Sequence, residues 1–144
     1  MAKSGSSVLK SVTILTALKH AWEDSLPGTS GRHEEGGFIL RDSEGTLSVF
    51  RWPKGSQKSI NLPRHIDCRI DGQEIVATFH THPNIGADYL QEPSETDKRA
   101  IRDDLDLKGN FYEGEYVISQ EIIYLISPHG VVNEVGYRRE ILGE

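Results

Sequence analysis

Two histidines near the middle of the chain stand in a pattern that suits a metal ion. His80 and His82 follow a largely apolar, partly β-branched run, residues 75–79, which predicts an inner strand that Pro83 ends. Residues two apart on a strand point to the same side, so both imidazoles can reach one ion. On its own, a His-x-His pair is a weak indication of a metal site.

A helix is predicted to begin after Ser94 and to run to about Leu107. Asp97, Ile101 and Leu105 are spaced to share one face, and the two apolar residues are expected in the core. Asp97 would then lie at the edge of an inward face, where an unpaired carboxylate is costly and a metal ion would remove the cost. The alternative is a capping box, in which Asp97 only bonds back to the Ser94 backbone.

Two histidines and one aspartate form a ligand set suited to zinc, with one coordination position left open. Zinc lowers the pKa of water and polarises a carbonyl, which is the chemistry of a hydrolase. Such a hydrolase needs a base, and the adjacent acids Glu34 and Glu35 are the candidates, because a confined carboxylate has its pKa raised into a useful range. A solvated loop acid is the alternative for Glu34, and Glu35 is its rival as base. The Ser94 hydroxyl is a candidate to stabilise an oxyanion.

The order of these residues resembles the signature of a known family. Residues 80–83, His-Thr-His-Pro, and 94–97, Ser-Glu-Thr-Asp, are similar to the His-x-His-Pro…Ser-x-x-Asp signature of the JAMM metalloproteases, also called JAB or MPN+ domains. The family carries an upstream Glu-x-x-Gly followed by apolar residues, and the stretch 34–40 matches it. Ten residues, 84–93, separate the two motifs here, where the family usually has about six or seven.

The resemblance implies a role for each of these residues. One zinc ion per chain would be held by His80, His82 and Asp97, with Glu34 as general acid/base and Ser94 as oxyanion donor. It also implies the layered architecture of JAMM/MPN domains, which is similar to that of cytidine deaminases.

The bulk properties are those of one soluble globular domain, residues 1–144, with a polar start over residues 1–7 that we expect to be frayed. The formal net charge of −6 argues against a nucleic-acid partner, and the largest basic cluster, Arg138-Arg139, is expected to be solvated. The single cysteine, Cys68, excludes an internal disulfide and favours a reducing compartment, the cytoplasm. No segment is long and apolar enough to predict a membrane span.

A mixed central β-sheet flanked by helices, of the α+β or α/β class, is the expected fold. An amphipathic helix is predicted from a stripe formed by Val8, Val12, Leu15, Leu18 and Trp22. Besides the histidine-bearing strand, strands are predicted at residues 37–40, 46–52, 115–119, 122–127 and 131–137.

Other catalytic classes fail on spacing. A His-Glu-x-x-His zincin starting at His33 would need histidine where Gly37 stands. The zinc deaminases need a Pro-Cys-x-x-Cys motif, and one cysteine cannot supply it. Cys68 lies near His65 but in no recognisable cysteine-protease signature.

The sequence thus predicts a zinc-dependent hydrolase of a peptide or isopeptide bond. The resemblance implies a protein or peptide substrate, such as the C-terminal tail of a ubiquitin-like or sulfur-carrier-like protein, and the loop 84–93 is a candidate selectivity element. Two alternatives stay open: a non-catalytic protein-binding module on the same fold, and a protease of this type that acts as an effector or toxin.

Overall fold

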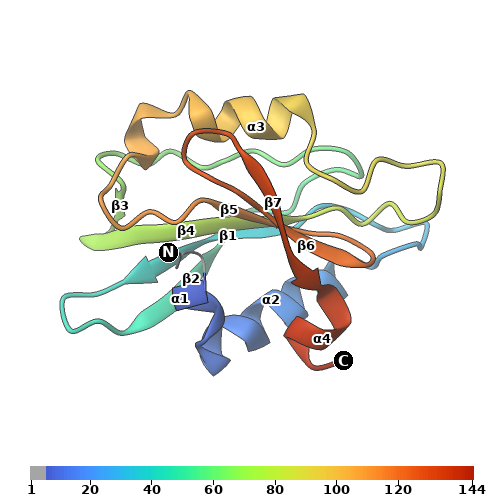
Figure 1. Cartoon of the computed structure of the whole chain (residues 1–144), viewed down its shortest axis with the longest axis horizontal. Helices are drawn as coiled ribbons and strands as arrows, with labels where there is room; N and C mark the ends of the chain where they lie inside the picture. The colour runs from blue at the N-terminus through green and yellow to red at the C-terminus, as the bar shows by residue number, and fades with distance from the viewer. Residues whose placement is uncertain (1–5) are drawn as a thin grey trace.

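A seven-stranded mixed β-sheet forms the centre of the computed structural model, which describes residues 6–144 (Figure 1). The elements are α1 (Ser6–Leu9), α2 (Val12–Asp24), β1 (Gly36–Arg41), β2 (Leu47–Arg51), β3 (Arg69–Ile70), β4 (Gln73–Thr81), α3 (Glu95–Arg102), the 3-10 helix η1 (Leu105–Leu107), β5 (Glu115–Ile118), β6 (Ile122–Ile126), β7 (Val132–Tyr137) and α4 (Arg138–Leu142). The strands lie in the order β2-β1-β4-β5-β6-β7, and β3 pairs with β4 outside this path.

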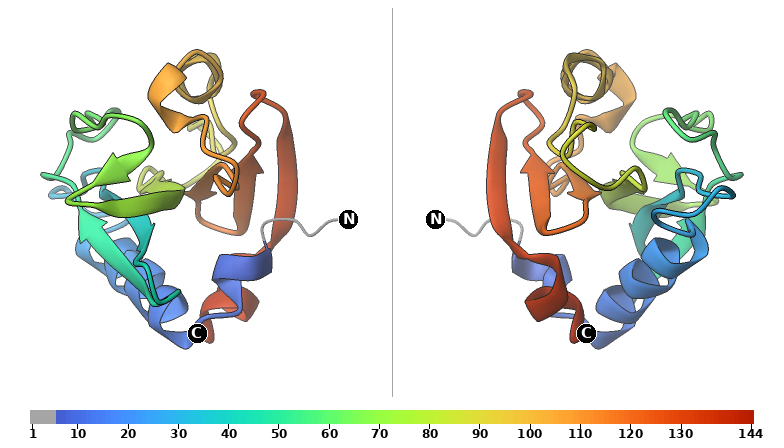
Figure 2. Two further views of the ribbon diagram at one scale, coloured as in Figure 1. Left: turned by 90° about the vertical axis from the view of Figure 1, so that its left-hand side faces the viewer. Right: turned by 90° about the vertical axis from the view of Figure 1, so that its right-hand side faces the viewer.

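The sheet separates two layers of helices. α3 covers one face, whereas α1, α2 and α4 lie against the other (Figure 1, Figure 2). Each layer encloses its own apolar core, one beneath α2 and one beneath α3. The expectation of a mixed sheet with helices on both sides is confirmed.

β4 is the strand around which the sheet is built. Its residues 75–81 are buried, and it pairs antiparallel with β1 on one side and parallel with β5 on the other. Because a tight turn cannot join parallel strands, the chain crosses over from β4 to β5 through α3 and η1.

The alternation of side chains decides which residues of β4 and β5 face α3. Phe79 and Tyr116 pack in the core beneath α2, whereas Val117 packs in the core that contains Ile101 of α3. Since neighbouring residues on a strand point to opposite faces, His80 and the first residue of β5 project toward α3.

The helix after Ser94 is shorter than predicted. α3 ends at Arg102, and Asp104 starts a separate 3-10 turn by accepting a hydrogen bond from the backbone of Asp106. The helical face breaks at this point, so Leu105 is 83% exposed and Leu107 is buried instead. The prediction that Leu105 lies in the core is therefore wrong.

The N-terminal helical stripe is also interrupted. Ser11 caps α2, so α1 and α2 are separate helices, and Val12 at the start of α2 is 78% exposed rather than packed. The buried members of the stripe are Val8, Leu18 and Trp22. Of the start predicted to be frayed, Ser6 and Ser7 open α1, and residues 1–5 lie outside the described residues.

α4 was not predicted. Within it, Arg138 is buried, with its guanidinium carbon 4.5 Å from the ring centroid of Trp22, and its Nε donates to the Gln120 carbonyl. The expectation that Arg138 is solvated is wrong, because this cation joins the end of the sheet to α2. No helix between residues 6 and 144 combines the length and the apolar character that crossing a membrane requires.

Candidate metal centre

His80 and His82 project toward α3 from the carboxyl end of β4. The backbone is held on both sides at this point, since Thr81 N donates to Glu35 O and His82 N donates to Ile118 O. The two Nε2 atoms lie 3.2 Å apart. The prediction that both rings reach one point is confirmed.

Asp97 meets the two rings from the first turn of α3. Its backbone N–H donates to Ser94 Oγ at 3.0 Å, and its Oδ2 accepts from Ser94 N at 2.8 Å, which completes a capping box. The same Oδ2 lies 3.2 Å from His82 Nε2, and Oδ1 lies 3.5 Å from His80 Nε2. The capping alternative is therefore correct as a description of the helix start, and it coexists with a place in the histidine cluster.

The three side chains have the spacing of ligands around one cation. Tetrahedral ligands at about 2.1 Å from an ion lie roughly 3.4 Å from one another. The observed separations of 3.2, 3.2 and 3.5 Å are close to that value, with Asp97 Oδ2 nearest His82 and Asp97 Oδ1 nearest His80. His80, His82 and Asp97 could therefore bind a metal ion, with His80 buried and the other two partly buried.

A second layer of acceptors fixes the orientation of both rings. His80 Nδ1 lies 2.5 Å from Glu115 Oε2, and His82 Nδ1 lies 3.0 Å from the carbonyl oxygen of Gln91. A carboxylate or carbonyl oxygen accepts a hydrogen bond, so each neutral ring carries its proton on Nδ1. The lone pair of each Nε2 then points into the cluster.

The two Nε2 lone pairs and the Asp97 carboxylate repel one another at these distances, so a proton or a cation between them stabilises the cluster. Burial disfavours protonated His80, yet the nearby carboxylates of Glu115 and Asp97 raise its pKa well above the ordinary value. Burial also opposes ionised Asp97, but hydrogen bonds from His80 and His82 hold its pKa below the ordinary range. Protons and a metal ion would therefore compete for the same atoms.

Glu115 is the residue of this site that sequence reasoning missed. It opens β5, and the parallel register places it opposite Thr78, two residues before His80. It is only 5% exposed. A buried acid at the start of an apolar strand needs a partner, which was a usable signal. The parallel pairing of β4 with β5, which identifies that partner, cannot be read from local sequence.

Glu34 lies beside the cluster. Its backbone pairs with the loop after β2, because Glu34 N donates to Ser56 O and Gly55 N donates to Glu34 O, both at 2.8 Å. Its side chain is 6% exposed, so the alternative of a solvated loop acid is wrong. Burial raises the pKa of Glu34 to about 7, although His80 and His82 oppose part of the rise.

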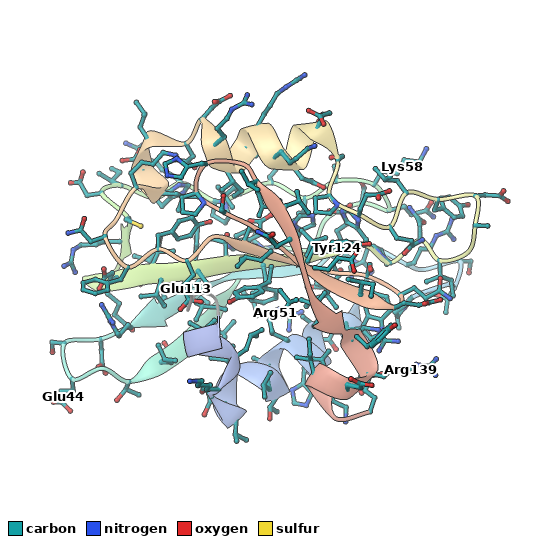
Figure 3. All side chains as sticks on the ribbon, viewed as in Figure 1. Glu44, Arg51, Lys58, Glu113, Tyr124 and Arg139 are labelled. Atoms are coloured by element: carbon teal, nitrogen blue, oxygen red, sulfur yellow. The ribbon has the colours of Figure 1, made fainter. Side chains whose placement is uncertain are left out.

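Glu35 faces the other side of the sheet. Its two carboxylate oxygens lie 2.7 Å from Arg51 Nη2 and 2.6 Å from His33 Nε2. Arg51 also contacts Asp24 of α2, and Figure 3 shows Arg51 on the α2 side of the sheet. The geometry thus favours Glu34 over Glu35 as the acid beside the metal ligands.

Two cavities meet at the cluster, and four residues line both of them: Glu34, Lys58, Ser94 and Asp97. The first, the loop cavity, has a volume of about 260 Å³ and continues along Asn84, Asp88, Tyr89 and Leu90. The second, the α3 cavity, has a volume of about 360 Å³ and continues between α3 and the loop 53–62. Lys58 lies on the α3 side of the sheet (Figure 3). A ligand at the cluster can therefore extend in two directions.

Comparisons of the chain with protein-family models, with curated proteins and with solved structures find no match.

Replacing His82 with alanine should remove metal binding, because two of the three ligands cannot hold an ion in this geometry. Wild type dialysed against a first-row divalent cation should retain about one ion per chain by elemental analysis, and His82→Ala should retain almost none. His129→Ala, at an exposed turn, is the matched control and should bind as wild type does. Equal metal content in both variants would contradict the assignment.

Glu115→Gln keeps the size of the side chain but removes the charge that supports His80. Loss of such an outer partner typically weakens metal affinity by roughly 10- to 100-fold. We expect a drop of that order in competition with a chromophoric chelator. Glu121→Gln, at an exposed position, should leave the affinity unchanged. Wild-type metal affinity in Glu115→Gln would show that the contact between Glu115 and His80 does not strengthen metal binding by His80.

The raised pKa of Glu34 predicts a pH-dependent cost to stability. Between its ordinary pKa of 4.5 and about 7, the folded state binds more protons than the unfolded state, so the free energy of unfolding falls as pH rises. In metal-free protein, Glu34→Gln should therefore raise this free energy by roughly 1–3 kcal/mol at pH 8 and change it little at pH 4. Urea unfolding at the two pH values measures this. The exposed Glu44→Gln is the control, and a larger gain at pH 4 would refute the burial argument.

Proposed function

We propose that this chain is a zinc-dependent hydrolase of peptide or isopeptide bonds, of the JAMM type. The observation that supports it best is the meeting of a metal-ligand set with a buried acid of raised pKa. His80, His82 and Asp97 lie at coordination spacing, and Glu34 lines both cavities that open beside them. A strongly perturbed carboxyl next to metal ligands in a cleft is typical of a catalytic site.

Zinc is the proposed ion, because two imidazole nitrogens and one carboxylate oxygen form a ligand set that zinc favours in catalytic sites. When bound, zinc polarises a carbonyl and activates water. Residues behind the two histidines also favour ion binding. Glu115 and the Gln91 carbonyl accept from the Nδ1 atoms and hold both rings in the orientation that ligation needs.

Glu34 is the proposed general acid/base. It takes a proton from water as the water oxygen adds to the carbonyl carbon, and it returns that proton to the amine nitrogen as the C–N bond breaks. Burial raises the Glu34 pKa to about 7 in the metal-free protein, and a bound cation lowers it again, so Glu34 is ionised and can accept a proton near neutral pH. Ser94 Oγ already accepts the Asp97 N–H, so its own hydrogen is available to the oxyanion.

The proposed substrate is a protein tail or peptide, and the resemblance of the motifs to JAMM proteases favours the C-terminal tail of a ubiquitin-like or sulfur-carrier-like protein. The mixed sheet with helices on both faces is compatible with the layered architecture of that family. An extended tail could pair with a strand edge near the site.

The loop 84–93 is the proposed selectivity element. It forms one wall of the loop cavity, and several side chains hold it in place. Arg32 Nε donates to Asn84 Oδ1, and Asn84 Nδ2 donates to the Gln57 carbonyl at 3.0 Å. At its far end, the Gln91 carbonyl contacts His82, so the loop both shapes the cavity and orients a metal ligand.

Glu34→Gln tests this function directly. The carboxamide cannot accept the proton of water, so we expect hydrolysis to fall by roughly 100- to 10,000-fold while the metal content stays at the wild-type level. In zinc-loaded wild type, the rate should rise with pH through a midpoint below about 7, because the bound cation lowers the Glu34 pKa from its value in the metal-free protein. Cleavage of ubiquitin-like and peptide substrates by the zinc-loaded protein, followed by mass spectrometry, measures both effects.

Glu35→Gln is the matched control, an identical change one residue along the chain on the opposite face of the sheet. It should keep most of the activity. Full activity in Glu34→Gln would remove Glu34 from the mechanism. Bound zinc with no hydrolysis of any substrate by wild type would instead favour the non-catalytic binding module.

A further inference from the structure

The α3 cavity differs in character from the metal centre that it adjoins. Away from the cluster its walls are mainly apolar, with Trp52 directly after β2, Ile60 and Leu62 from the following loop, and Ala100 and Ile101 from α3. The hydroxyl residues Ser59 and Thr96 also line it. Charged side chains gather at the cluster end, and Lys58 joins them there from the loop. The cavity therefore runs from a polar end at the reacting centre to an apolar end.

The apolar end is built from the core of the protein. Trp52 is 4% exposed and Ile101 is 1% exposed, and both belong to the core cluster beneath α3. Trp52 packs edge-on against Phe38, with ring centroids 5.3 Å apart. Side chains fixed in this way form a rigid wall rather than a surface that rearranges.

The loop 53–62, which forms the outer wall, belongs to the longer segment 53–68 that precedes β3, and this segment is held at both ends. Near the cluster it pairs with the Glu34 backbone through Gly55 and Ser56. At its far end, His65 Nε2 lies 2.8 Å from Asp104 Oδ2, which ties the loop to the segment that follows α3. The cavity is therefore formed without a ligand, which lowers the entropic cost of binding one.

We propose that the α3 cavity is a substrate subsite that takes an aliphatic side chain next to the scissile bond. This inference rests on the proposed hydrolase and adds a substrate class to it. The cavity shares Glu34, Ser94 and Asp97 with the metal centre, so a side chain inside it belongs to a residue adjacent to the bond under attack. A volume of about 360 Å³ lies at the small end of the range for ligand sites and is more than large enough for one aliphatic side chain.

Charge selects against the other side chains. Glu34, Asp97 and Glu115 line the cavity, which disfavours an acidic side chain. These acids would attract a lysine or arginine, but they lie at the cluster end beside Lys58, and a cation at the apolar end would be buried away from them at a cost. An aliphatic side chain replaces water along Ile60, Leu62 and Ile101 with no such cost.

Ala100→Phe tests the subsite, because residue 100 lines the cavity from an exposed position on α3, where a larger side chain does not disturb the core. Arg99→Phe is the matched control: it adds the same ring one residue earlier, at an exposed position that lines neither cavity. Metal content and the unfolding midpoint of both variants should equal those of wild type.

The probes are dye-labelled nonapeptides of glycine and serine that differ only in the central pair: Gly-Gly, Leu-Gly, Gly-Leu and Lys-Gly. Fluorescence anisotropy measures their binding to zinc-loaded Glu34→Gln, which does not turn them over. One of the two leucine peptides should bind roughly 10- to 100-fold tighter than Gly-Gly. The side of the bond on which leucine acts identifies the residue that enters the cavity. Adding Ala100→Phe should abolish the preference, and adding Arg99→Phe should preserve it.

Equal affinity for the leucine and Gly-Gly peptides, tighter binding of Lys-Gly, or an equal loss in both phenylalanine variants would overturn the subsite. Cleavage by wild type separates this from the proposed function. Hydrolysis without a leucine preference would refute the subsite and leave the hydrolase. A leucine preference in binding that Ala100→Phe removes, with no hydrolysis of either these peptides or the ubiquitin-like substrates by wild type, would support the cavity as a binding site and refute the hydrolase.

Discussion

A buried cluster of ionisable groups at the carboxyl end of β4 is the constraint on which the rest of the structure depends. His80, Glu34 and Glu115 are 2%, 6% and 5% exposed, and Asp97 adjoins them. Burial of so many charges is unfavourable unless each is paired or neutralised. Two of these groups need no further partner in the metal-free protein. Glu34 keeps its proton up to about pH 7, and the Glu115 carboxylate pairs with His80. A proton or a cation between His80, His82 and Asp97 can balance what remains, and these three side chains are the group that could hold a metal ion.

The elements that hold the cluster are the same ones that define the fold. The parallel pairing of β4 and β5 brings Glu115 next to His80, and it requires the crossover that contains α3. The capping box starts α3 at Ser94, so that Asp97 falls in the first turn, facing the rings. Moving the helix start by one residue would turn this carboxylate by about 100° away from the histidines. The residue at which α3 begins therefore determines whether Asp97 faces the two histidines.

Local pattern predicted six of the seven strands and the shared direction of the two histidines, because strand alternation is a short-range property. It missed the two-residue strand β3. It failed at Leu105, where a local cap outweighs the helical spacing, and at Arg138 and Glu115, where distant contacts decide. Leu105 followed the helical spacing, but Asp104 ends the face with a new turn. Arg138 is polar by composition, yet it stacks on Trp22, which is far away in the sequence. Glu115 was overlooked for the same reason, since its partner lies on a strand 35 residues earlier.

The pairing register of β1 determines whether Glu34 or Glu35 faces the two histidines. Because adjacent residues face opposite sides, a slip of one residue would exchange their positions. Gly36 and Gly37 prevent that slip by close packing: a Cβ on Gly36 would lie 2.7 Å from Phe79 O, and one on Gly37 would lie 2.9 Å from Phe50 O. Only a glycine pair lets the chain pass between β4 and β2 at this point, so the register has a single solution. The two glycines thus help to set which acid lies beside the candidate metal ligands.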